Sequence, residues 1–145
     1  GATAAVAAQD DEAILEELVA HETANLDAWY GASDPGPYVA EVAEVATAYD
    51  AFVPMTLMVG DGIRESYSAL AGMIPHIDYQ IVDPAVDVRG DIVIFTFFIE
   101  GTVVDDPDAP YGPWNVTKVM NRTADCWQMI HTHFTSPMPP PAPAE

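Results

Sequence analysis

Apolar residues in the first part of the chain recur at helical spacing. Residues 10–32 carry them three or four positions apart, which predicts one long amphipathic helix. Acidic residues at 10–12 fall in its first turn, where the helix dipole favours negative charge. The segment 34–37, Asp-Pro-Gly-Pro, ends this helix, because proline and glycine do not continue it. Shorter helices are predicted at 38–45 and 61–73 by the same spacing.

One acidic residue interrupts the apolar stripe of the long helix. Glu22 lies between Leu18 and Leu26, on the side that also carries Trp29. Two interpretations remain open at this point. Either the stripe meets solvent at Glu22, or Glu22 points into a polar cavity.

The pattern changes from helix to strand in the second half of the chain. Residues 46–59 look like a strand broken at Pro54, and residues 77–88 are broken at Asp83-Pro84, so that strand bends or lies at a sheet edge. A strand is predicted at 92–104, and its run 92–99 is apolar, β-branched and aromatic, as in a buried strand. A polar loop is predicted at 105–113, rich in Asp, Pro and Gly.

The last part of the chain predicts a β-hairpin with polar side chains on its faces. Two alternating segments flank a tight turn at Ala124-Asp125. Period-two alternation predicts that two sets of residues each share one face: Asn115, Thr117, Val119 and Asn121 on the first strand, and Trp127, Met129, His131, His133 and Thr135 on the second. Buried polar groups are costly unless they are hydrogen-bonded or line a cavity, so we place the candidate site on this hairpin.

Helices followed by a run of antiparallel strands predict an α+β fold. We expect about three helices packed on one face of a curved, mostly antiparallel sheet, which forms a cone with a pocket inside. We expect residues 10–137 to form the single domain. Residues 1–9 are predicted to be a disordered end or the remnant of a leader or expression tag, and residues 138–145 a proline-rich tail.

Charge and composition exclude several classes of partner. The chain has 23 acidic and 4 basic residues and a net charge of −19, so its surface repels nucleic acid and anionic lipid. No apolar run reaches the roughly 18 residues of a membrane span. The single cysteine, Cys126, excludes an internal disulfide and leaves the compartment open between cytoplasm and export. We predict no cofactor.

The order of the predicted elements resembles the nuclear transport factor 2-like superfamily, which has a cystatin-like fold. That superfamily includes SnoaL-like polyketide cyclases and ketosteroid isomerases. The hairpin is most similar to SnoaL-like proteins related to the association domain of calcium/calmodulin-dependent protein kinase II. Matching residues in the hairpin are Thr117, Val119, Arg122, Trp127, Ile130, His131, His133 and Ser136. Further matches are VDVRGDIVIFTF, Phe52-x-Pro54 and Gly60-Asp61-Gly62, so the likeness covers roughly residues 12–137.

The chain departs from the family pattern at informative positions. Val53 stands where the family often has an acidic residue, and Phe134 stands where the kinase domain has an arginine. The aspartate base and tyrosine–acid arrangement of ketosteroid isomerases has no match at the corresponding positions. The resemblance therefore implies the fold, and with it a homodimer paired through the sheets, because the superfamily usually pairs in this way.

Three interpretations of His131 and His133 stay open. They hold a polar ligand or orient a base in the pocket, they are structural histidines satisfied by neighbours, or they bind a metal ion that needs a third ligand. The candidate catalytic residues are His131, His133 and Glu22. The candidate ligand-binding residues are Asn115, Thr117, Tyr49, Tyr67, Phe98 and Trp29.

Two functions remain open from the sequence. The first is a SnoaL-like protein that binds a small, partly apolar ligand in the cone cavity and acts on it by acid–base catalysis. The second is a non-catalytic association or ligand-sensing domain, in which the same fold serves assembly. The run 92–99 is apolar on both faces, which favours a partner subunit as cover for one of them.

Overall fold

The computed structural model describes residues 2–137 and 143, and it opens on one long helix. Helix α1 spans Ala2–Leu26 and continues as a π-helical turn, η1, at Asp27–Gly31. The predicted helix is therefore present, although it begins before residue 10. A buried stripe follows helical spacing along Ile14, Leu18, Glu22, Leu26 and Tyr30, and Asn25 is buried beside it. This stripe packs the helix on the sheet. The predicted tail at 138–145 lies, apart from residue 143, outside the described residues.

The middle of the chain forms short elements whose bounds differ from those predicted. Helix α2 covers Gly36–Glu41, and β1 already begins at Val42 (Val42–Asp50), so the predicted helix at 38–45 is too long. A tight turn at residues 51–52 leads to β2, Val53–Val59. The break within 46–59 is therefore present, but its predicted position at Pro54 is wrong, because Pro54 lies inside β2. Helix α3 covers Asp61–Ser68 and ends before the predicted limit of residue 73, because turns follow it.

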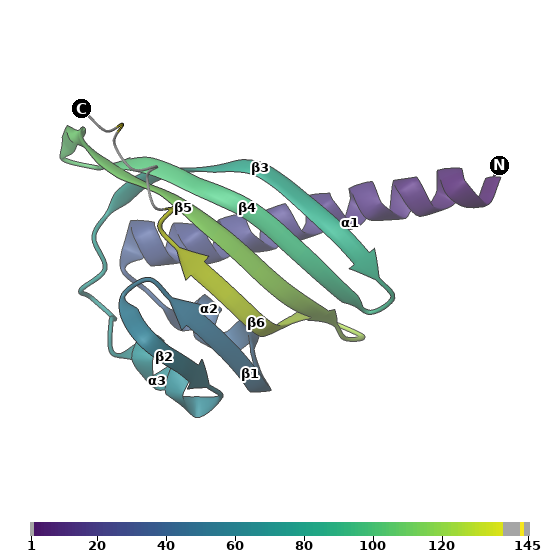
Figure 1. The fold of residues 1–145 in the computed structure, drawn as a ribbon, viewed down its shortest axis with the longest axis horizontal. Coiled ribbons are helices and arrows are strands. Elements are labelled where there is room, and N and C mark those ends of the chain that lie inside the picture. The colour runs from purple at the N-terminus through teal and green to yellow at the C-terminus, as the bar shows by residue number, and fades with distance from the viewer. Residues whose placement is uncertain (1, 138–142, 144–145) are drawn as a thin grey trace.

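Four long strands complete one six-stranded sheet. They are β3 (Ile77–Arg89), β4 (Ile92–Val103), β5 (Asp106–Arg122) and β6 (Trp127–Thr135). The strand order is β2-β1-β6-β5-β4-β3, and all neighbours are antiparallel except β1 and β6 (Figure 1). Strand β3 lies at the edge, and its register shifts between Val82 and Ala85, as Asp83-Pro84 predicts.

The polar segment 105–113 is not a loop, and this prediction is wrong. Residues 106–113 form the first part of β5, where Pro110 and Tyr111 pair with Thr102 and Gly101 of β4. Pairing with a neighbouring strand has overridden the turn propensity of the Asp, Pro and Gly residues.

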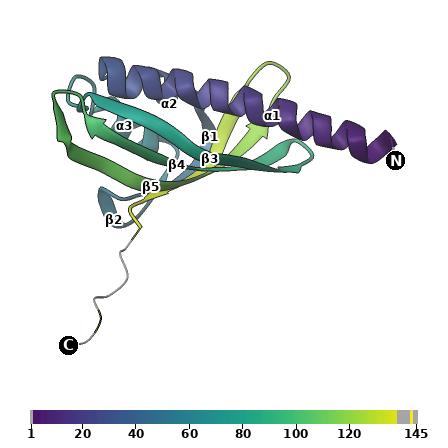
Figure 2. The same cartoon turned by 90° about the horizontal axis from the view of Figure 1, so that it is seen from above.

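The helices cover one face of the curved sheet. Figure 2 shows α1 running across this face, with the sheet curving beneath it. The side chains between the two layers form the core, including Phe95, Phe97, Met120 and Met129. The predicted α+β fold is confirmed. No helix in residues 2–137 combines the length and the apolarity needed to cross a membrane.

A bulge in β6 reverses the faces that simple alternation assigns to the last hairpin. Met129 pairs with Met120, but His131 pairs with Val119, so Ile130 is an extra residue in the ladder. Trp127 and Met129 therefore face the core, whereas His131 and His133 face the opposite side of the sheet, which we call the outer face. The prediction that these four residues share one face is wrong.

Candidate functional site

A cavity of about 620 Å³ lies between the sheet and the helices. Most of its wall is aromatic or aliphatic, and its polar members come chiefly from α1, α2, β1 and β5. The polar and ionisable lining residues are Glu22, Tyr30, Tyr38, Glu41, Asp50, Ser66, Tyr67, Tyr111, Lys118 and Thr132. Ser66, Leu70 and Met73 are exposed members of the lining, so the cavity opens to solvent beside α3.

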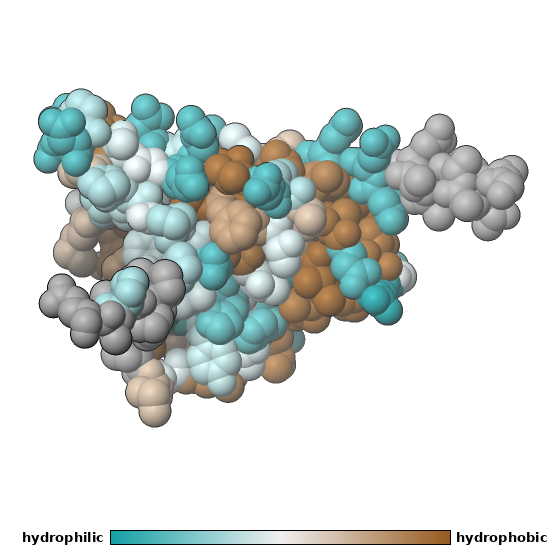
Figure 3. Space-filling model, turned by 45° about the horizontal axis from the view of Figure 1, so that its top comes forward, coloured by the Kyte–Doolittle hydropathy of each residue, from teal (hydrophilic) through white to brown (hydrophobic). Residues whose placement is uncertain are grey.

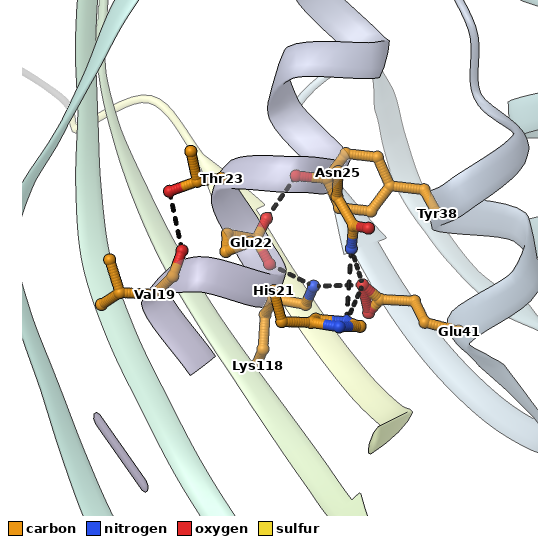
Figure 4. A network of polar contacts seen from close by, with 8 residues as sticks. All are labelled: Val19, His21, Glu22, Thr23, Asn25, Tyr38, Glu41 and Lys118. Atoms are coloured by element: carbon orange, nitrogen blue, oxygen red, sulfur yellow. Dashed lines mark hydrogen bonds and ion pairs between the residues drawn. The ribbon is translucent and has the colours of Figure 1, made fainter. Parts of the chain in front are cut away.

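Three charged side chains meet in the wall of this cavity. The Nζ atom of Lys118 donates hydrogen bonds to Glu22 Oε1 at 2.6 Å and to Glu41 Oε1 at 2.7 Å (Figure 4). All three side chains are at most 4% exposed. They come from β5, α1 and α2, so this cluster joins the sheet to both helices.

Further donors complete the cluster around the two carboxylates. The Tyr38 hydroxyl donates to Glu22 Oε2, and Asn25 Nδ2 donates to Glu41 Oε1 at 2.6 Å. His21 Nε2 lies 3.5 Å from the same Glu41 oxygen. The other oxygen, Glu41 Oε2, is buried and has no hydrogen-bond partner among the described residues. The cluster therefore leaves one acceptor unused.

Burial and ion pairing have opposite effects on the pKa values of Glu41 and Lys118. Burial alone would raise the pKa of Glu41, but Lys118 and His21 outweigh it and hold this pKa below its ordinary value. Burial would lower the pKa of Lys118, but Glu22 and Glu41 raise it above the usual range. Burial and the nearby Glu22 raise the pKa of Tyr38, so its hydroxyl stays protonated as a donor. At neutral pH Glu41 and Lys118 are both charged.

Asp50 is a separate carboxylate in the cavity wall. It stands at the end of β1, and its Oδ1 accepts a hydrogen bond from the Phe52 amide at 2.8 Å. Burial raises the pKa of Asp50, and the Phe52 hydrogen bond only partly offsets this. A raised pKa brings a carboxylate closer to the range in which it exchanges protons near neutrality.

A pair of tyrosines adds hydroxyl groups to the same wall. The hydroxyls of Tyr30 and Tyr111 are 2.8 Å apart, and both residues line the cavity. Burial raises the pKa of each of them, and the charge of Asp50 adds to this effect. Both hydroxyls are therefore protonated at neutral pH. One of them donates to the other, so the pair has one hydroxyl hydrogen left to donate to a ligand.

The structure separates the predicted site residues into two groups. Glu22, Trp29 and Tyr67 line the cavity. The others do not: His131, His133, Asn115, Thr117, Tyr49 and Phe98. The placement of His131 and His133 in the pocket assumed an unbroken alternation, which the bulge at Ile130 interrupts. The remaining four side chains alternate with buried residues of β1, β4 and β5 and therefore face away from the core.

The two histidines contact neighbours on the outer face instead. Thr47 Oγ1 is 2.7 Å from His131 Nδ1, and the Tyr49 ring packs against the ring of exposed His133 at 5.4 Å. Burial and the neighbouring His133 lower the pKa of His131. Within the described part of the chain, no three His, Cys, Asp or Glu side chains are grouped so as to hold a metal ion.

Lys118, Glu41 and Asp50 were not among the predicted site residues, although the sequence contains a signal for two of them. Lys118 alternates with Val116 and Met120, which are apolar, and a lysine in such a row indicates a buried charge with a partner. Asp50 continues the small apolar row of Ala46 and Ala48 on β1. Glu41 gives no comparable signal, because it was placed inside a longer predicted helix.

One family model matches more than half of the chain. The model of the SnoaL-like domain matches residues 54–139. The chain belongs to the SnoaL-like domain family. No curated protein matches it.

Solved structures share this fold at low sequence identity. A nuclear transport factor 2-like protein of unknown function from Pseudomonas putida KT2440 is 20% identical, with a TM-score of 0.74 over 88% of this chain and 89% of that chain. A "putative ketosteroid isomerase" from Parabacteroides distasonis ATCC 8503 is 24% identical, with a TM-score of 0.71 over 87% and 89%. The association domain of C. elegans CaMKII is 15% identical, with a TM-score of 0.71 over 88% and 98%. These likenesses show that the domain shares the fold of nuclear transport factor 2-like proteins.

Proposed function

We propose that this SnoaL-like domain binds a small, partly apolar ligand in its cavity. The observation that carries the proposal is a 620 Å³ space whose largely apolar wall also holds a buried ionic cluster and Asp50. Buried charges are costly, and a fold retains them where they orient a polar group or support chemistry. An apolar wall with a few fixed polar groups is the usual composition of a small-molecule site.

Asp50 is the residue that we propose to move a proton on the ligand. Its carboxylate is paired with no cation among the described residues, and its pKa is raised by burial. Glu22 is less free, because Lys118 and Tyr38 already donate to its two oxygens. The Tyr30–Tyr111 pair supplies one donor for a carbonyl or hydroxyl oxygen. This arrangement supports general acid–base chemistry next to a polarised carbonyl.

Blocking the mouth of the cavity tests whether ligands bind inside it. Ser66 is exposed and lines the cavity, so Ser66→Trp should fill the entrance without disturbing the core. Ser68→Trp is the matched control, because Ser68 is also exposed on α3 but does not line the cavity. In an NMR screen of small aromatic compounds, we expect hits to be lost in Ser66→Trp and kept in Ser68→Trp.

The outcome of this screen decides the binding proposal. Hits that survive Ser66→Trp unchanged, or a screen without hits, would contradict ligand binding in the cavity. For hits that contain a carbonyl, deuterium exchange at the adjacent carbon reports proton transfer. Exchange that continues in Asp50→Asn would rule out Asp50 as the proton-moving group.

The outer face of the sheet favours assembly as a second candidate function. Strand pairing places Ile94, Val119, His131, Thr47 and Val59 in one row across this face. Ile94 and Val59 are exposed although they are apolar. Figure 3 shows further apolar side chains gathered on the right of the view. CaMKII hub and association domains are among the structures that share this fold. We propose that the domain forms a homodimer through this face.

A further inference from the structure

The charges that line the cavity do not balance. Glu22, Glu41 and Asp50 are carboxylates, and Lys118 is the only cationic residue among the described members of the lining. Within the ionic cluster, two carboxylates against one ammonium leave one net negative charge when His21 is uncharged, and Asp50 adds a second when it is ionised. An anionic ligand would meet this charge at low dielectric, whereas a cationic ligand would be attracted by it.

The unused acceptor of Glu41 is a suitable place for the positive charge of a ligand. Glu41 Oε1 is close to three donors, on Lys118, Asn25 and His21, but Oε2 has none in the described part of the chain. The Glu41 side chain is 2% exposed. A buried carboxylate oxygen without a donor is unfavourable, so a ligand that brings an N–H donor gains a hydrogen bond there.

Three aromatic rings stand beside this cluster and form a second feature suited to a cation. Trp29 packs edge-on against Tyr38 at 5.4 Å and against Tyr67 at 5.7 Å, and the two tyrosines are 6.5 Å apart. All three line the cavity, and the Tyr38 hydroxyl connects the group to Glu22. The faces of aromatic rings attract ammonium groups, as Lys118 already shows by its position 5.0 Å from the Tyr38 ring.

We infer that the ligand of this cavity is a small organic cation, an amine on an apolar body. The ammonium group binds at Glu41 Oε2 next to the rings of Trp29, Tyr38 and Tyr67, and the apolar body fills the rest of the space. This inference rests on the proposed function, because it assigns a chemical class to the ligand of the same cavity.

Three probes with one shared body test the inference. Phenylbutylamine, phenylbutanol and phenylbutanoate present an ammonium, a hydroxyl and a carboxylate on the same apolar chain. In calorimetric titrations at neutral pH, the amine should bind at least about tenfold more tightly than the alcohol, and the carboxylate most weakly. The indole resonance of Trp29 should shift on binding, whereas that of Trp127, which lies outside the cavity and donates to Glu17, should not.

Variants that remove one charge show whether the amine is attracted by the cavity or by the acidic surface. Glu41→Gln should weaken the binding of the amine about tenfold and leave the binding of the alcohol nearly unchanged, because the substitution removes the charge but keeps an acceptor. Glu44→Gln is the control, because it removes the same charge from an exposed position on β1 and should change neither affinity. If Glu41→Gln does not fold, Asp50→Asn replaces it, and the affinities for the amine and the alcohol are compared in the same way.

The possible outcomes distinguish the two proposals. Preferential binding of the alcohol or the carboxylate, or equal losses for amine and alcohol in Glu41→Gln, would overturn the cation assignment while leaving the cavity as a ligand site. An amine that binds without moving the Trp29 resonance would also overturn it. Failure of all three probes would count against both the cation assignment and the proposed function.

Discussion

Lys118 is the residue whose environment most constrains the interior of this domain. A fully buried ammonium is unfavourable by itself, and here two glutamates from two different helices compensate it. A pair of hydrophobic residues could fill the same volume at equal or lower free energy. The cluster is therefore better explained by what it presents to the cavity than by a gain in stability.

Replacing Lys118 should reveal the charges that it compensates. Lys118→Met leaves Glu22 and Glu41 buried without a cation, and we expect it to lower the free energy of unfolding by about 3–5 kcal/mol at neutral pH. In the native protein the lowered pKa of Glu41 gives stability that is present at neutral pH and is lost as the pH falls through this pKa. In the variant the effect of pH should reverse, because burial then favours a protonated Glu41.

Urea denaturation at neutral and at mildly acidic pH checks this expectation. The difference between native protein and Lys118→Met should shrink on acidification. The matched control is the triple variant Glu22→Gln, Lys118→Met and Glu41→Gln, which removes all three charges and should lose less stability than the single change. A single variant as stable as the triple variant would contradict the proposed role of Lys118.

At the scale of elements, Arg64 joins α3 to the start of β1. Its Nη2 donates to the Ala43 carbonyl at 2.5 Å and to the Val42 carbonyl at 3.4 Å, while Nη1 pairs with Asp61 at 2.8 Å. Strand β1 pairs with β6 at Val42 and then again only from Thr47. The arginine therefore supplies hydrogen bonds to a part of β1 where the strand ladder is interrupted, and it fixes α3 beside the mouth of the cavity.

Removing this contact should destabilise the domain more than removing an exposed ion pair. We expect Arg64→Met to lower the free energy of unfolding by about 1–3 kcal/mol, because it leaves carbonyl oxygens of buried residues without donors. Arg89→Met is the control, because among the described residues Arg89 pairs only with exposed Asp87, and its effect should stay within about 0.5 kcal/mol. Equal effects of both changes in urea denaturation would show that Arg64 does not stabilise the junction.

The elements also show which parts of the fold alternation can predict. The long helix, the edge strand β3 and the final hairpin follow from local patterns, and all are present. The break within 46–59 is also present, but at residues 51–52 and not at Pro54. The faces of the hairpin do not follow, because the extra residue Ile130 is specified by pairing with β5 and has no local signature. Glu22 lines the cavity. This was one of the two interpretations of the sequence, since a lone acid in an apolar helical stripe is a local signal.

Over the whole molecule, surface charge and the outer face have opposite effects on association. Each copy carries a net charge of −19, which keeps copies apart. The outer face nevertheless exposes Ile94, Phe98 and Val59 in a sheet whose other face is covered by helices. Association through this face must therefore overcome electrostatic repulsion, and added salt should strengthen it because salt screens that repulsion.

A charge placed in the outer-face row tests the homodimer. We expect analytical ultracentrifugation to show a dimer of the native chain at moderate salt, with weaker association at low salt. Ile94→Glu puts a carboxylate in the middle of the proposed interface and should give a monomer with an unchanged unfolding midpoint of the isolated subunit. Met73→Glu, an equally drastic change at an exposed residue of the cavity mouth, should leave the dimer intact. A monomeric native chain would contradict the homodimer. A dimer that survives Ile94→Glu but not Met73→Glu would place the interface at the cavity mouth and leave the exposed Ile94 and Val59 of the outer face without a partner.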